Sequence, residues 1–118
     1  MRIYRALIAA TLLASASSVM ASVGDRNGAE QINAGDFTAA ERIIMHERAM
    51  FPQDPDLALN LAAVYIKTGR LTQARALYQE VLTRPDEPLA MSNGQDASAH
   101  AIAALALRRI EATTLSAR

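Results

Sequence analysis

The amino-acid sequence predicts an all-α protein made of helical hairpins, with about four main helices. Three observations support this fold class. The composition is rich in alanine and leucine and holds only five aromatic residues, three Tyr and two Phe, which favours helices over a β-sandwich. Apolar residues recur at helical spacing in segments that proline and glycine bound. The chain also resembles itself when it is shifted by 34 residues, a period typical of helical repeats.

The first 21 residues have the features of a signal peptide rather than of a folded element. Arg2 and Arg5 give a positive start, residues 6–14 are apolar, and residues 19–21 read Val-Met-Ala, a small-residue cleavage site. The alternative, an uncleaved membrane anchor, is disfavoured because the apolar run falls short of the roughly 20 residues that span a bilayer. We therefore expect a chain that begins at Ser22, has no membrane span, and is periplasmic or secreted.

The segment 22–34 is expected to be a flexible leader that holds at most one short helix. Residues 22–27 are polar and lack periodicity, and a helical turn over 28–34 is too brief to be stable without a neighbour. Gly35 breaks this turn. Thr38 and Glu41 then have the spacing of a capping box, which predicts a helix over 38–50 that ends before a proline.

The central segment predicts an antiparallel pair of helices. Asp54 followed by Pro55 is a strong helix start, because aspartate accepts free amide hydrogens and proline tolerates the first position. This helix should run to about residue 68, where Gly69 supplies a left-handed residue that ends it. A second helix is expected over 72–83, because Pro85 forbids a longer run.

The last third of the chain predicts a linker and one more helix. Residues 86–95 contain Pro88 and the turn pair Asn93-Gly94, so we expect them to form no regular element. A helix should begin near Asp96, and residues 113–118 should fray. Its expected apolar stripe consists of Ala99, Ala103, Ala104, Leu107 and Ile110.

The repeat has a recognisable pattern. The shift of 34 places Gly35 on Gly69, Ala40 on Ala74, and Ile44 on Tyr78. The second copy reads Ala58, Leu61, Ala62, Tyr65, Gly69, Ala74, Tyr78 and then Pro85. This series resembles the tetratricopeptide repeat, in which small residues stand where two helices cross and tyrosines fill the space around the crossing. The resemblance implies a short α-solenoid over residues 35–112, with one full repeat flanked by half repeats.

The resemblance also implies a binding surface. In this family the first helix of each hairpin lines a concave groove, and the corresponding residues here are Asp56, Leu59, Asn60, Ala63, Ile66 and Lys67. Such a mixed apolar and polar surface suits an extended or helical peptide. The alternative is an ordinary helix face that the last helix covers in part. Asn60 resembles an asparagine that grips peptide carboxylates, but the lysine and arginine residues that accompany it in the family are missing.

Several functional classes lack support in the sequence, and we expect neither an enzyme nor a cofactor. There is no cysteine, the formal net charge is zero, and basic residues do not cluster, which disfavours thiolate chemistry and nucleic-acid binding. His46 and His100 fall on different expected helices, so a shared metal site is not expected. Asp54 and Asp56 could be read as a pair of catalytic carboxylates, but their position at the start of a helix explains both residues without catalysis.

The resulting functional hypothesis is a small exported interaction module that holds a protein or peptide, as an adaptor or accessory to an envelope complex. The alternative is a structural protein that forms a homodimer. A chain of 118 residues that loses its signal peptide buries only a modest core. Its stability should therefore be marginal unless a partner or a second copy of the chain covers exposed apolar surface.

Overall fold

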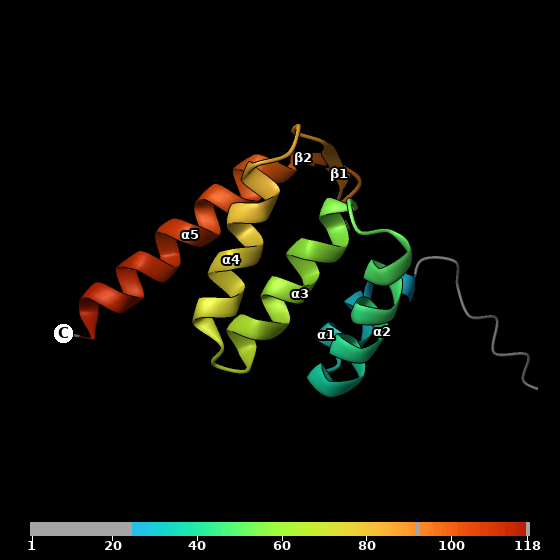
Figure 1. Ribbon diagram of the computed structural model, residues 1–118, viewed down its shortest axis with the longest axis horizontal. Helices are drawn as coiled ribbons and strands as arrows, with labels where there is room; N and C mark the ends of the chain where they lie inside the picture. Colours follow the sequence, from blue (N-terminus) through green and yellow to red (C-terminus); the bar gives the residue numbers. More distant parts are fainter. Residues whose placement is uncertain (1–24, 92, 118) are drawn as a thin grey trace, which may run out of the picture.

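The computed structural model describes residues 25–91 and 93–117; the predicted signal peptide lies outside these ranges. Figure 1 shows the helices and strands of the described chain. They are the 3-10 helix η1 (Asp25–Asn27), α1 (Ala29–Asn33), α2 (Phe37–Met50), α3 (Pro55–Lys67), α4 (Leu71–Leu82), β1 (Pro88–Ala90), β2 (Asp96–Ser98) and α5 (Ala99–Ser116). The prediction of an all-α fold with four main helices is confirmed.

The four long helices stand in a row, and each packs against the next one in the sequence (Figure 1). The core lies between them. Ala62 and Ala74 are fully buried, so α3 and α4 approach each other closely at these small side chains. The other repeat residues in the core are Ala40, Ile44, Ala58, Leu61, Tyr65 and Tyr78. Gly69 lies outside the core, in the left-handed region with φ 77°, and ends α3.

The start of α2 differs from the predicted capping box. Asp36, rather than Thr38, caps the helix, because the Asp36 carboxylate accepts a hydrogen bond of 3.1 Å from the Ala39 amide. Glu41 does not reach back to the helix start. It pairs with Arg70 in the turn between α3 and α4, and this tertiary contact replaces the local one.

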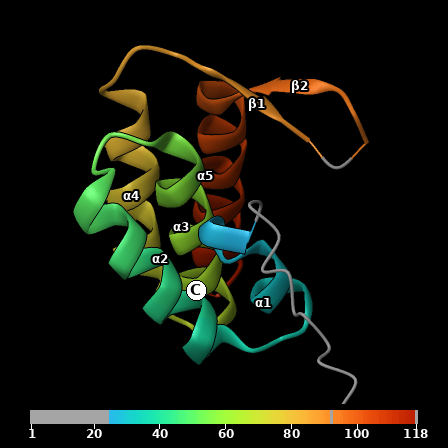
Figure 2. The ribbon, with the colours of Figure 1, turned by 90° about the vertical axis from the view of Figure 1, so that its right-hand side faces the viewer.

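The expected linker over residues 86–95 contains a strand. Strands β1 and β2 pair antiparallel, with Leu89 opposite Ala97, in a hairpin that extends beyond the helices (Figure 2). Helix α5 therefore begins at Ala99 rather than near Asp96. Asp86 fixes this start, because its carboxylate accepts hydrogen bonds from the Ser98 hydroxyl (2.6 Å) and the His100 amide (3.0 Å).

Both ends of the described chain are helical. The short helix expected within residues 28–34 is present as α1, and η1 precedes it; both pack against α2. The tail predicted to fray from residue 113 remains helical to Ser116. The hydroxyls of Thr113, Thr114 and Ser116 each donate a hydrogen bond to the carbonyl four residues earlier, so these side chains fold back on the helix.

Candidate functional site

The groove predicted on α3 is closed at its N-terminal end by η1. The side-chain amide of Asn27 donates a hydrogen bond of 2.8 Å to the Asp56 carboxylate. The Asn60 amide in turn donates a hydrogen bond of 2.9 Å to the Asn27 carbonyl. Two of the six predicted groove residues are thus occupied by contacts within the chain, and the segment that covers them precedes α2 rather than belonging to the last helix (Figure 2).

The remaining predicted groove residues divide between core and surface. Leu59 is only 7% exposed and belongs to the core, so its expected role as a surface anchor is wrong. Ala63 is half-buried and Lys67 is exposed. Ile66 is half-buried and faces a pocket that the sequence did not predict. Among the six predicted groove residues, Ile66 alone contributes to that pocket.

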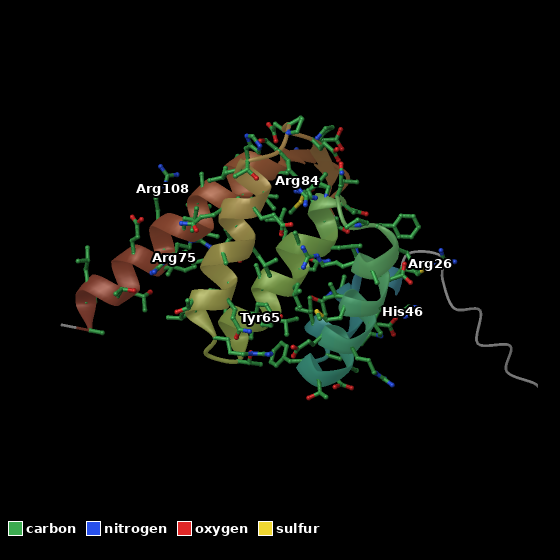
Figure 3. The ribbon with its side chains drawn as sticks, viewed as in Figure 1. Arg26, His46, Tyr65, Arg75, Arg84 and Arg108 are labelled. Atoms are coloured by element: carbon green, nitrogen blue, oxygen red, sulfur yellow. The ribbon has the colours of Figure 1, made fainter. Side chains whose placement is uncertain are left out.

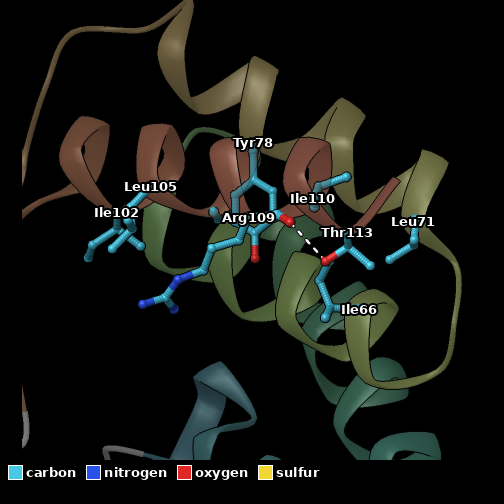
Figure 4. A pocket seen from close by; sticks show the side chains of 9 residues that line it. Ile66, Leu71, Tyr78, Ile102, Leu105, Arg109, Ile110 and Thr113 are labelled. Atoms are coloured by element: carbon cyan, nitrogen blue, oxygen red, sulfur yellow. Dashed lines mark hydrogen bonds between the residues drawn. The ribbon is translucent and has the colours of Figure 1, made fainter. Parts of the chain in front are cut away.

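This pocket lies where the end of α3 meets α4 and α5, and we name it the α5 pocket. It has a volume of about 500 Å³. Ile102 and Leu105 line one side and Ile66, Leu71 and Thr113 the other, with Tyr78 between them (Figure 4). Ala106, Arg109 and Ile110 complete the lining. A concave, mainly apolar site of this size can take up apolar side chains of a ligand.

Helix α5 has two apolar faces, which explains why the sequence analysis missed the pocket. One face, with Ala99, Ala103 and Ile110, is buried in the core. The second face lines the pocket with Ile102, Leu105, Ala106, Arg109 and Thr113, which follow one another at intervals of three, one, three and four residues. The spacing of these residues is also that of one face of a helix. The sequence therefore carries a second helical stripe beside the one predicted to face the core.

The polar groups of the α5 pocket are few. Arg109 is its only charged lining residue and is exposed, so its guanidinium can meet an acidic group at the rim. The Thr113 hydroxyl donates a hydrogen bond of 2.9 Å to the Arg109 carbonyl (Figure 4). Burial raises the pKa of the Tyr78 phenol, so its ring acts as an uncharged wall. The pocket therefore favours a ligand with apolar side chains and a nearby carboxylate.

Ion pairs hold the scaffold around the pocket. Arg70 binds both oxygens of Glu41, at 2.9 and 2.6 Å, and its guanidinium lies 4.4 Å from the centre of the Tyr65 ring. The hydrogen bonds from Arg70 hold the pKa of the Glu41 carboxyl below its usual value. A second network joins Arg48 and Arg84 to Glu80. The Glu41–Arg70 and Arg48–Glu80 pairs connect α2 to the hairpin of α3 and α4, whereas the Glu80–Arg84 pair is local to the end of α4.

The histidines and the paired aspartates occupy structural positions. His46 is exposed on α2, whereas the His100 ring nitrogen Nε2 lies 2.6 Å from the Arg84 carbonyl. Asp54 caps α3 through a hydrogen bond from the Asp56 amide. Across residues 25–91 and 93–117, no three His, Cys, Asp or Glu side chains are arranged to hold a metal ion. Within the same ranges, no helix is long and apolar enough to cross a bilayer.

Comparison with known proteins identifies the repeat. A search of curated proteins and a search of solved structures returned no significant match. The family model of the tetratricopeptide repeat matches residues 31–106, from α1 to the middle of α5. The match covers well over half of the 118 residues. Repeats of this family are typically non-catalytic modules for protein–protein interaction. The chain belongs to the tetratricopeptide-repeat family.

Proposed function

We propose that this protein is a small, non-catalytic interaction module that holds a segment of another protein in the α5 pocket. The observation that carries the proposal is the pocket itself, an apolar hollow of about 500 Å³ that three helices of the repeat enclose. An interaction module of this family implies a protein or peptide as the partner. An amphipathic helix or an extended segment can insert its apolar side chains into such a hollow.

The lining defines the kind of segment that fits. Leu105 is 43% exposed although it is a large aliphatic residue, so a partner that covers it removes apolar surface from water. Arg109 lies on the same face of α5. A segment with two apolar side chains followed by Asp, Glu or a terminal carboxylate would satisfy both features.

The first 21 residues support an exported, periplasmic location for this module. In that location it would act as an adaptor or accessory of an envelope complex. N-terminal sequencing of the protein recovered from its native host tests the location. A chain that begins at Ser22 is expected, whereas a chain that begins at Met1 and sediments with membranes would contradict export.

A second copy of the chain is the alternative occupant of the α5 pocket. It is favoured by the exposure of Leu105 and by the position of α5, which packs on α4 and is the last helix of the described chain. Sedimentation equilibrium over a range of concentrations distinguishes the two functions. A monomer is expected for a module that holds a different protein, and a dimer for the self-associating alternative.

The functional test compares two leucines of the same helix. Leu105→Asp places a charge in the pocket, whereas Leu115→Asp makes the same change at a residue that is 66% exposed and lies outside the pocket. Loss of one buried leucine contact costs about 1.5 to 3 kcal/mol, which corresponds to at least tenfold weaker binding.

Capture of envelope proteins on immobilised protein provides the measurement. Proteins that the wild type and Leu115→Asp retain should be lost from Leu105→Asp, while circular dichroism shows equal helix content for all three. Equal capture by both variants would mean that the α5 pocket is not the binding surface.

A further inference from the structure

A second pocket lies at the other end of the row of helices, where η1, the end of α2 and the start of α3 meet, and we name it the α2 pocket. Its volume is about 320 Å³. The lining is mainly polar, in contrast to that of the α5 pocket, and includes three carboxylates. The lining residues are Arg26, Asn27, Glu47, Phe51, Asp54, Asp56 and Leu57.

Glu47 is the unusual member of this set. It is only 9% exposed and faces the pocket. Among the residues that the structure describes, none forms a hydrogen bond or an ion pair with its carboxylate. The side chain is largely buried, but its carboxylate oxygens are not among the polar atoms that are fully shielded from water without a partner, so they open onto the pocket. A cationic ligand there would meet a carboxylate that no protein group already neutralises.

The fold itself does not require an acid at this position. The repeat period of 34 places Glu47 of α2 on Val81 of α4, and Val81 is a buried core residue. An aliphatic side chain is therefore compatible with the equivalent site of the helical hairpin. The Glu47 carboxylate is therefore not needed for the packing of α2, and it remains available to a ligand in the α2 pocket.

The two aspartates add to the negative charge of the α2 pocket. Asp54 uses one oxygen to accept the Asp56 amide at 2.9 Å, and Asp56 uses one to accept the Asn27 amide at 2.8 Å. Neither forms an ion pair with a described residue. Arg26, at the same end of the molecule (Figure 3), is the single cation of the lining. Three carboxylates against one guanidinium leave a net negative charge.

The size and composition of the pocket indicate an organic cation rather than a metal ion. The described acids do not converge closely enough for a metal centre. Phe51, which is half-exposed, adds an aromatic surface to the lining, and aromatic rings attract ammonium groups. We propose that the α2 pocket binds an alkylammonium group, as carried by a lysine side chain or by a small aliphatic amine, and that Glu47 is its principal counter-charge.

Titration of the ¹⁵N-labelled protein with butylammonium chloride tests the site, with sodium chloride at equal ionic strength as the reference. Saturable shifts are expected at the amides around Glu47, Phe51 and Asp56. Glu47→Gln should weaken binding by about tenfold or more, because the main opposite charge is removed. Arg26→Gln should tighten binding, because it removes the competing cation. Glu111→Gln, an exposed acid of α5, should bind as the wild type does.

Folding of the Glu47→Gln variant is checked by thermal unfolding without amine, and its midpoint should equal or exceed that of the wild type. A lysine-containing peptide, compared with its norleucine analogue, identifies the source of the ammonium group. Binding of the lysine peptide indicates a polypeptide ligand, and binding of butylammonium alone indicates a small amine. The proposal is overturned if butylammonium gives no saturable shifts, if Mg²⁺ gives the same shifts, or if Glu47→Gln binds equally well.

Discussion

The two ends of the helical row solve the same problem in different ways. Each end carries half a repeat and must cover one face of a central helix. At the N-terminal end, η1 covers the start of α3 through polar contacts of Asn27 with Asp56 and Asn60, while α1 packs on α2. At the C-terminal end, the long helix α5 packs on α4 through one face (Figure 1) and leaves an apolar pocket beside α3 (Figure 4). A few polar residues thus close one end to apolar groups and leave only the small polar α2 pocket there, whereas a whole helix leaves the larger apolar pocket at the other end.

At the N-terminal end, the backbone at Gly28 lies very close to α2. Gly28 has φ 73°, and a Cβ atom at this position would lie 2.8 Å from the Ile44 side chain. The glycine therefore allows the short leader to lie directly on α2. At the open end, the second apolar face of α5 is only partly covered: Ile102 and Ala106 pack against the core and are half-buried, whereas Leu105 is 43% exposed. This difference is the reason for our proposal that a partner segment binds at the C-terminal end.

The largest expected effect comes from the hairpin between the two ends. Ala62 is fully buried where α3 crosses α4, and Ala62→Leu should destabilise the protein by about 1 to 3 kcal/mol, because overpacking forces the helices apart. Both ends rest on this hairpin, so both should loosen together. Urea unfolding followed by circular dichroism measures the change. An unaltered midpoint would contradict close packing at the crossing.

A smaller effect is expected at the closed end alone. Gly28→Ala should cost about 1 kcal/mol or more, because it combines left-handed strain with a contact against Ile44. Gly35→Ala is the matched control, since Gly35 has φ 76° but nothing within 4 Å of an added Cβ. The difference between the two free energies of unfolding isolates the contact. If the two variants are equally stable, the leader does not press on α2.

The smallest effect is a dependence of stability on pH. Hydrogen bonds from Arg70 lower the pKa of Glu41, and hydrogen bonds from the His100 amide and the Ser98 hydroxyl lower that of Asp86. A carboxyl with a lowered pKa in the folded state stabilises the protein at neutral pH, and this contribution is lost as the pH falls through that pKa.

Two variants separate the acid sensitivity of the two halves. In Glu41→Gln, the free energy of unfolding should depend less on pH, because the contact between α2 and the turn after α3 no longer titrates. In Asp86→Asn, it should also depend less on pH, because the contact at the start of α5 no longer titrates. Urea unfolding at several pH values between 7 and 3 provides the measurement. A pH dependence as steep as that of the wild type in both variants would contradict this assignment.

The local signals in the sequence were sufficient for the central hairpin. Asp54 and Pro55 start α3, Gly69 ends it, and alanines mark the crossing with α4. The features that sequence reasoning missed depend on contacts between distant residues. Asn27 reaches Asp56 across 29 positions, and Asp86 sets the start of α5 from 12 residues away. Leu59 was assigned to a groove, but only packing in three dimensions decides which face of α3 is covered.

Mapping an acidic apolar ligand tests the central claim that the C-terminal end is open for binding and the N-terminal end is closed to apolar groups. Hexanoate combines an aliphatic chain with a carboxylate that Arg109 can attract. Its titration into the ¹⁵N-labelled protein should shift amides around Ile66, Leu71, Leu105 and Arg109, and leave those around Asn27 and Asn60 unchanged. Shifts that cluster at η1 and the start of α3 instead, or that spread evenly over the helices, would contradict the account.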